Sequence, residues 1–125
     1  MPKSKPVVAL IEDDLMIGEM YKAKFAKNGF EIQIATDGAA GLELVKKIKP
    51  DIILLDIIMP KLDGFEVLKQ LRGNPDFKKT PVVMLTNLGQ EEDMKKGRDL
   101  GATDYFVKTN FIPSAIVDKV KSLLK

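Results

Sequence analysis

Hydrophobic and polar residues follow two kinds of pattern along the chain. Short apolar runs recur at Val7–Ile11, Ile52–Leu55 and Val82–Leu85. Such runs are typical of strands that are buried on both faces of a parallel sheet. Two more strands are predicted at Glu31–Ile34, where polar and apolar residues alternate, and at Tyr105–Val107. The pattern therefore predicts five strands.

The segments between these strands carry apolar residues at helical spacing. In the first segment, Ile17, Met20, Tyr21 and Phe25 follow the i, i+3, i+4, i+8 pattern of one buried helix face, and Gly29 marks the end of the helix. Comparable stripes predict helices after the second, third and fifth strands. We expect the side chains of each stripe to pack in the core.

The helix predicted after the fourth strand is different. Within Gln90–Asp99, Met94 is the only strongly apolar residue, and Gly97 lowers the helix propensity of the segment. We therefore expect this fourth helix to be mobile.

Five strands that alternate with five helices predict an α/β fold. A single doubly wound, five-stranded parallel sheet would be covered by helices on both faces. With 125 residues, 45% of them hydrophobic, the chain can bury one core but not a second. We expect residues 1–125 to form one domain.

Charge and composition narrow the possible functions. The 20 basic and 18 acidic residues are spread along the chain, so no basic block indicates direct contact with nucleic acid. The absence of cysteine excludes disulfides, and the absence of histidine excludes an imidazole base and a phosphohistidine on this chain. No apolar run is long enough to span a membrane, and Met1–Pro6 lacks the apolar segment of a signal peptide. We expect a cytoplasmic protein that does not contact the membrane.

Candidate chemistry is concentrated after the third strand. Asp56 stands where the buried run Ile52–Leu55 ends, and Pro60 and Gly64 then force the chain through a loop. In open α/β sheets, ligands bind at the carboxyl ends of the strands. An aspartate held rigidly at such a position suits a nucleophile or a metal ligand. The alternative is an aspartate that caps a helix or lies in a loop.

Further polar residues follow the other strands. Glu12, Asp13 and Asp14 come directly after the first strand, Thr86 ends the fourth, and Lys108 follows the fifth. Each also has an ordinary interpretation, because acids favour helix starts, threonine favours strands, and a lysine at a strand end can point to solvent. Asp13 or Asp14 can cap the next helix.

The string Asp-x-x-Met-Pro-x-x-Asp-Gly at residues 56–64, together with these residues after the other strands, resembles the response-regulator receiver domains of two-component signalling, such as the chemotaxis regulators. The resemblance covers nearly the whole chain. It implies a flavodoxin-like (βα)5 fold with the strand order 2-1-3-4-5.

The resemblance also implies roles for the acidic residues. Asp56 would accept a phosphoryl group. Asp13 and Asp56 would bind Mg²⁺ directly, Glu12 would bind it through water, and the backbone carbonyl of Ile58 would complete the protein ligands. Oxygen ligands are those that Mg²⁺ prefers. Asp14 would only cap a helix.

On the same resemblance, Lys108 would pair with Asp56 and then with a phosphoryl oxygen, and the hydroxyl of Thr86 would donate to another oxygen. Tyr105 would then turn inward toward the space left by Thr86. The face made by the fourth helix, fifth strand and fifth helix would change partners as a result. Tyr105 can alternatively be an ordinary strand residue.

The partners follow from the same resemblance. A histidine kinase or a histidine phosphotransfer protein would donate the phosphoryl group, and a downstream protein would bind the changed face. The protein would be a monomer or a weak, phosphorylation-dependent dimer. It would not be an enzyme beyond catalysing its own phosphorylation and dephosphorylation.

Three alternatives remain open. A phosphatase with an aspartyl nucleophile typically has a second acid two residues later, where this chain has Ile58. A degenerate receiver would act only as a protein-interaction module. A flavin-binding protein is disfavoured because the run Glu12–Asp14 would repel the flavin phosphate.

The sequence departs from the family pattern near the predicted site. Asn87 replaces a small residue, Thr109 replaces a proline, and Ile58 and Leu88 are apolar. Apolar residues cannot orient a water, so we expect slow self-dephosphorylation. We also expect a trans peptide bond between Lys108 and Thr109, since only proline makes the cis form inexpensive.

Overall fold

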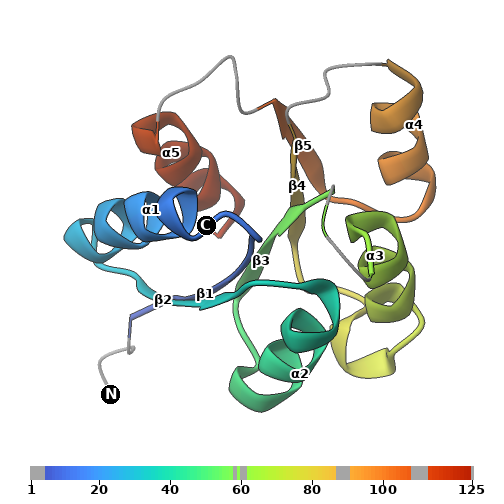
Figure 1. Cartoon of the computed structure of the whole chain (residues 1–125), viewed down its shortest axis with the longest axis horizontal. Helices are drawn as coiled ribbons and strands as arrows, with labels where there is room; N and C mark the ends of the chain where they lie inside the picture. The colour runs from blue at the N-terminus through green and yellow to red at the C-terminus, as the bar shows by residue number, and fades with distance from the viewer. Residues whose placement is uncertain (1–4, 58, 60–61, 87–90, 108–112, 125) are drawn as a thin grey trace.

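The computed structural model describes residues 5–57, 59, 62–86, 91–107 and 113–124 (Figure 1). In these residues, strands and helices alternate along the chain, as the hydrophobic pattern predicts. The strands are β1 (Val7–Ile11), β2 (Glu31–Ala35), β3 (Ile52–Asp56), β4 (Val82–Thr86) and β5 (Asp104–Val107).

The helices lie between and after the strands. A short 3-10 helix, η1 (Pro75–Phe77), was not predicted; it follows the third α-helix, and Asn74 caps it. The α-helices are α1 (Leu15–Lys27), α2 (Gly38–Ile48), α3 (Gly64–Arg72), α4 (Glu91–Asp99) and α5 (Pro113–Leu123).

All strand pairs are parallel, and the order across the sheet is β2-β1-β3-β4-β5. This confirms the predicted doubly wound, flavodoxin-like fold. The first strand lies beside both the second and the third, because β2 is placed on one side of β1 and β3 on the other. The carboxyl ends of β1 and β3 are therefore neighbours, with Ile11 paired to Leu55.

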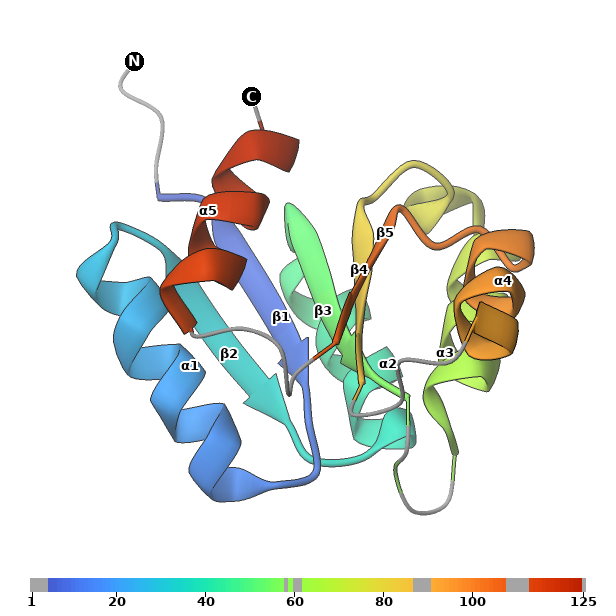
Figure 2. The same cartoon turned by 90° about the horizontal axis from the view of Figure 1, so that it is seen from above.

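Two layers of helices cover the sheet (Figure 2). The helices α1 and α5 contact each other on one face, while α2, α3 and α4 form a row on the other. Two separate buried clusters fill the spaces beneath them. The three central strands are buried along most of their length, which explains why they read as continuous apolar runs.

The predicted stripe of α1 is partly wrong. Tyr21 and Phe25 are buried, and Ile17 packs against the same cluster. Met20, however, is 48% exposed. Leu15 and Met16, also in α1, are exposed even more. The reason is that the helix needs only a narrow stripe to cover the sheet, so Met20 falls outside it.

Among the described residues, no helix has the length and apolar character that crossing a membrane requires.

Candidate functional site

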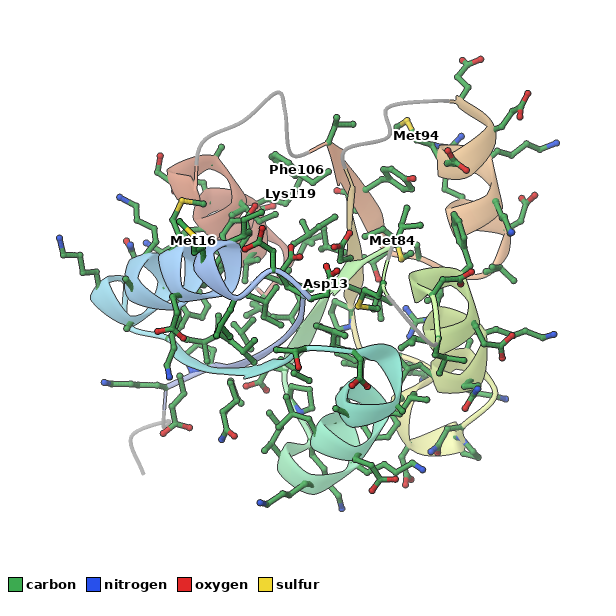
Figure 3. The ribbon with its side chains drawn as sticks, viewed as in Figure 1. Asp13, Met16, Met84, Met94, Phe106 and Lys119 are labelled. Carbon is green, nitrogen blue, oxygen red and sulfur yellow. The ribbon has the colours of Figure 1, made fainter. Side chains whose placement is uncertain are left out.

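Three carboxylates meet at the carboxyl end of the sheet. Glu12 and Asp13 follow β1, and Asp56 is the last residue of β3. Carboxylate oxygens of the three residues lie within 4.8 Å of one another. Glu12 and Asp56 are 1% and 6% exposed. Asp13, which is labelled in Figure 3, is exposed to solvent. The cluster therefore has a buried side and an open side.

The segment from β1 to α1 holds the first two acids in place. The backbone amide of Glu12 donates to the carbonyl of Ala35 at 2.9 Å, which extends the pairing of β1 with β2. The amide of Asp14 donates to a carboxylate oxygen of Glu12 at 3.1 Å. The side chain of Asp14 caps α1 by accepting from the amides of Met16 and Ile17. Asp14 is thus the cap, and its carboxylate is directed to the helix, not to the cluster.

Asp56 is held by the strand that carries it and by the start of α3. It pairs with Leu85 of β4, and the next residue, Ile57, donates its amide to the carbonyl of Leu85 at 3.2 Å. The amide of Gly64 donates back to the carbonyl of Ile57 at 2.7 Å. A methyl group on Gly64 would collide with the backbone of Asp56 and Ile57, so only glycine allows α3 to begin this close to the strand.

Tyr21 of α1 is a member of this site that its sequence position did not reveal. It is 2% exposed, as expected for a core residue. Burial raises the pKa of its hydroxyl above the usual range, and the negative charges of Glu12 and Asp56 raise it further. The phenol therefore stays protonated beside the acids. The helical spacing of Tyr21 predicts only that it is a core residue. Nothing in the sequence indicates that its hydroxyl lies near the carboxylates.

Other predicted site residues are described only in part or not at all. The backbone of Thr86 ends β4 and pairs with Val107. Nothing is described of its side chain. Ile58, Asn87, Leu88, Lys108 and Thr109 lie outside the described residues, so the roles of Ile58 and Lys108 stay predictions, as do the slow dephosphorylation and the trans peptide.

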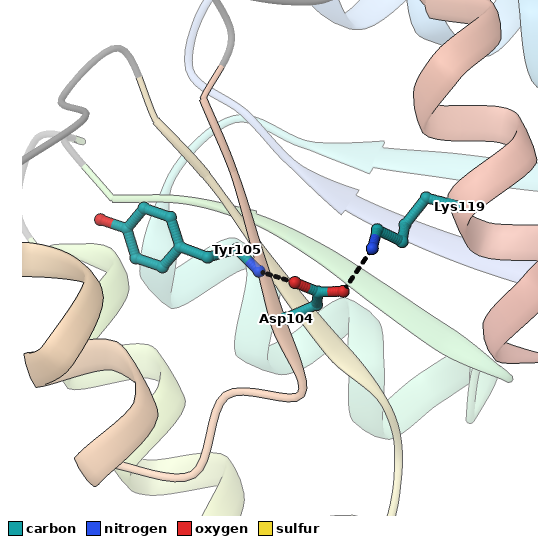
Figure 4. A network of polar contacts seen from close by, with 3 residues as sticks. All are labelled: Asp104, Tyr105 and Lys119. Carbon is teal, nitrogen blue, oxygen red and sulfur yellow. Dashed lines mark hydrogen bonds and ion pairs between the residues drawn. The ribbon is translucent and has the colours of Figure 1, made fainter. Parts of the chain in front are cut away.

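Tyr105 lies on the side of β5 that faces α4. A methyl group on Gly97 of α4 would be 3.2 Å from a ring carbon of Tyr105, so the ring packs against that glycine. The preceding residue, Asp104, points the other way and forms an ion pair with Lys119 of α5 at 2.7 Å (Figure 4). The other oxygen of Asp104 accepts the amide of Tyr105 at 2.8 Å. Consecutive residues of β5 thus contact α4 and α5.

Comparison with known families gives a match over most of the chain. A model of the response regulator receiver domain matches residues 8–121. The DNA-binding dual master transcriptional regulator RpaA of Synechocystis is 38% identical over 120 residues, which are 96% of this chain and 49% of that protein. The response regulator MprA of Mycobacterium leprae is 33% identical over 94% of this chain and 50% of its own length.

The chain thus spans about half the length of the curated relatives it matches. One of these relatives is described as DNA-binding, so the similarity does not support the expectation that nucleic acid is not contacted.

Solved structures with the same fold match nearly end to end. The chemotaxis response regulator CheY4 of Vibrio cholerae superimposes with a TM-score of 0.90 at 30% identity, covering 97% of this chain and 100% of that one. The receiver domain of the Francisella response regulator 1452 gives a TM-score of 0.89 at 34% identity, with coverage of 96% and 97%. The beryllofluoride-activated receiver domain of Klebsiella pneumoniae RstA superimposes with a TM-score of 0.88 at 28% identity. The match covers 95% of this chain and 98% of that one.

Proposed function

The chain belongs to the family of response regulator receiver domains, and on that basis we propose that Asp56 accepts a phosphoryl group from the phosphohistidine of a histidine kinase or phosphotransfer protein. Residues 1–125 act as one receiver domain in this proposal. Histidine is absent from the chain, so the phosphohistidine belongs to a partner. The reaction forms a bond between phosphorus and a carboxylate oxygen of Asp56 and breaks the phosphorus–nitrogen bond of the donor.

The acidic cluster is the observation that carries this proposal. Asp56 is the only one of its three acids that ends a strand, and both β3 and the start of α3 fix its backbone. A nucleophile held in one position loses little further freedom when it reacts. Glu12 and Asp13 are available as supporting ligands because they come from the neighbouring strand.

The chemistry of the cluster suits a divalent cation. Three carboxylates within 4.8 Å repel one another unless positive charge lies between them. All-oxygen ligands with an open side suit Mg²⁺, which retains several waters. Asp13 and Asp56 would bind Mg²⁺ directly, Glu12 through water, and the carbonyl of Ile58 would add a further ligand. The metal supplies positive charge for the phosphoryl oxygens.

Lys108 and Thr86 would contact the phosphoryl group once it is attached. A phosphorylated aspartate gains negative charge and acceptor oxygens, which attract an ammonium group and a hydroxyl donor. Tyr105 then turns inward, and the face formed by α4, β5 and α5 changes its affinity for a downstream protein. The chain's own chemistry is limited to its phosphorylation and dephosphorylation.

The donor protein must approach from the open side of the cluster. Near the open side of the cluster, the first turns of α1 expose three apolar side chains. The exposed fraction is 60% for Leu15, 84% for Met16 and 48% for Met20. Apolar residues on an otherwise polar surface favour contact with another protein. We assign this part of α1 to the donor's docking surface.

The proposal is tested by intact mass after incubation with a small phosphodonor and Mg²⁺. The native chain should gain one phosphoryl group, and Asp56→Asn should gain none, because an amide oxygen is a poor nucleophile. Asp76→Asn is the matched control: it removes a carboxylate that is exposed and distant from the cluster, and it should be modified like the native chain. Chelation of Mg²⁺ should abolish the gain in the native chain and in Asp76→Asn.

A full equivalent of phosphate on Asp56→Asn would overturn the assignment. Turnover of many equivalents of a phosphomonoester would instead favour the aspartyl phosphatase, and a native chain that is never modified would favour the degenerate receiver.

A further inference from the structure

Helix α4 is attached to the rest of the molecule by few contacts. All nine of its residues are described, and Gly97 is the only one that is buried. That glycine lies against the ring of Tyr105, with 3.2 Å between the ring and the position of an added methyl group. The distance leaves no room for a larger side chain unless the ring shifts. The position of α4 and the position of Tyr105 are therefore linked.

The residue before Gly97 makes the second attachment. The ammonium group of Lys96 lies over the ring of Phe65 in α3, 4.5 Å from the ring centroid. The ring faces a groove of about 270 Å³ between the two helices, lined by Asp63, Phe65, Glu66, Lys69, Lys96 and Leu100. A cation this close to an aromatic face is attracted by the ring electrons.

Phe65 is in turn close to the acceptor. It follows Gly64, whose amide donates to the carbonyl of Ile57 and which packs directly on the backbone of Asp56. Phe65 itself is 9% exposed and belongs to the buried cluster on this face of the sheet. The ring under Lys96 is thus fixed to the strand that ends in Asp56.

The far end of α4 is clamped. Arg72, the last residue of α3, donates to the carbonyl of Gly101 at 2.9 Å and to the carbonyls of Phe77 and Thr80 at 2.7 and 2.8 Å. Gly101 follows α4 and has a φ of +102°, a conformation that favours glycine. The clamp fixes the carboxyl end of α4, so a displacement of the helix is largest toward its other end.

We propose that the contact between Lys96 and Phe65 is a latch that holds α4 against α3, and that phosphorylation of Asp56 works against this latch. The inference rests on the proposed function, in which Tyr105 moves after phosphorylation. Gly97 and Lys96 are consecutive residues of one helix, and the helix is clamped at Gly101. When the Tyr105 ring leaves Gly97, α4 follows and turns about the clamp. This movement carries Lys96 away from Phe65.

If the contact between Lys96 and Phe65 must break on phosphorylation, the contact stabilises the unphosphorylated arrangement. Removing it should therefore favour the phosphorylated arrangement. Lys96→Met keeps most of the length of the side chain and removes its charge. Beryllofluoride, a phosphoryl mimic, should then bind in the presence of Mg²⁺ about two- to fivefold more tightly, the range that an exposed cation–π contact supplies. Simple electrostatics predicts the opposite sign, because losing a positive charge weakens the binding of an anion.

The experiment measures the dissociation constant of beryllofluoride with saturating Mg²⁺ by following backbone amide signals in the native chain and its variants. Lys69→Met is the matched control, because Lys69 lines the same groove and carries the same charge. We expect it to bind no more tightly than the native chain. Lys96→Arg should bind like the native chain, since a guanidinium group also stacks on an aromatic ring.

Phe65→Leu should tighten binding as Lys96→Met does, and the double variant should bind no more tightly than either single one. Unchanged or weaker binding by Lys96→Met would overturn the latch, and so would equal tightening by Lys69→Met. A native chain that does not bind beryllofluoride at all would overturn the proposed function itself, so the two failures are distinguishable.

Discussion

Helices α3 and α4 have nine residues each and cover the same face of the sheet, but they are held in different ways. Five residues of α3 are buried, Val67 and Leu68 completely and Phe65 and Leu71 nearly so. In α4 only Gly97 is buried. Apolar burial fixes α3, while α4 depends on a latch and a clamp.

The difference assigns different tasks to the two helices. The start of α3 packs on the backbone of Asp56, so any looseness there would disturb the acceptor. Helix α4 lies against Tyr105, the residue proposed to move. A helix that must move in response to a small change in free energy cannot also bury a large surface against the core.

The largest effect should come from shortening a buried side chain of α3. Leu68→Ala should lower the free energy of unfolding by about 2–5 kcal/mol, because it leaves a cavity in the core. Met94→Ala in α4 should cost less than about 1 kcal/mol, since Met94 is only partly buried and alanine favours helix. Urea denaturation of both variants measures the contrast. Equal losses would show that α4 contributes as much packing as α3.

A smaller effect should come from adding a methyl group to a glycine in each helix. In Gly64→Ala the methyl carbon would lie 2.8 Å from the Cα of Ile57, so the variant should lose about 1–3 kcal/mol of stability. In Gly97→Ala the contact with Tyr105 is looser, and the gain in helix propensity of about 1 kcal/mol offsets it. We expect its stability to change by less than about 1 kcal/mol. Thermal unfolding of both variants provides the measurement, and a larger loss for Gly97→Ala would contradict the comparison.

Much of the fold could be predicted because each central strand is buried on both faces. That burial requires continuous apolar runs, and such runs are visible without a structure. The prediction that Met20 packs in the core is wrong, because helical spacing identifies a set of residues on one side of a helix and does not fix how wide the covered stripe is. The weak apolar pattern of Gln90–Asp99 predicts a mobile helix, and the structure has the helix at Glu91–Asp99 with only Gly97 buried. The mobility itself stays a prediction.

The acidic cluster could be predicted in part for a topological reason. Residues that follow neighbouring parallel strands meet at one edge, so Glu12, Asp13 and Asp56 were expected together, and they are. The adjacency of the two strands came from the family resemblance. The hydroxyl of Tyr21 and the pair of Lys96 and Phe65 were not predicted, because both depend on how a helix is rotated and where a long side chain ends. Sequence spacing does not determine either.

Hydrogen exchange of the backbone amides in α3 and α4, with and without beryllofluoride and Mg²⁺, tests most directly whether one helix is fixed and the other adjustable. We predict that amides of α4 exchange at least about tenfold faster than those in the interior of α3 in the native chain. Beryllofluoride should change the rates in α4 and leave those in the interior of α3 the same. Equal exchange in the two helices, or a response confined to α3, would contradict this division.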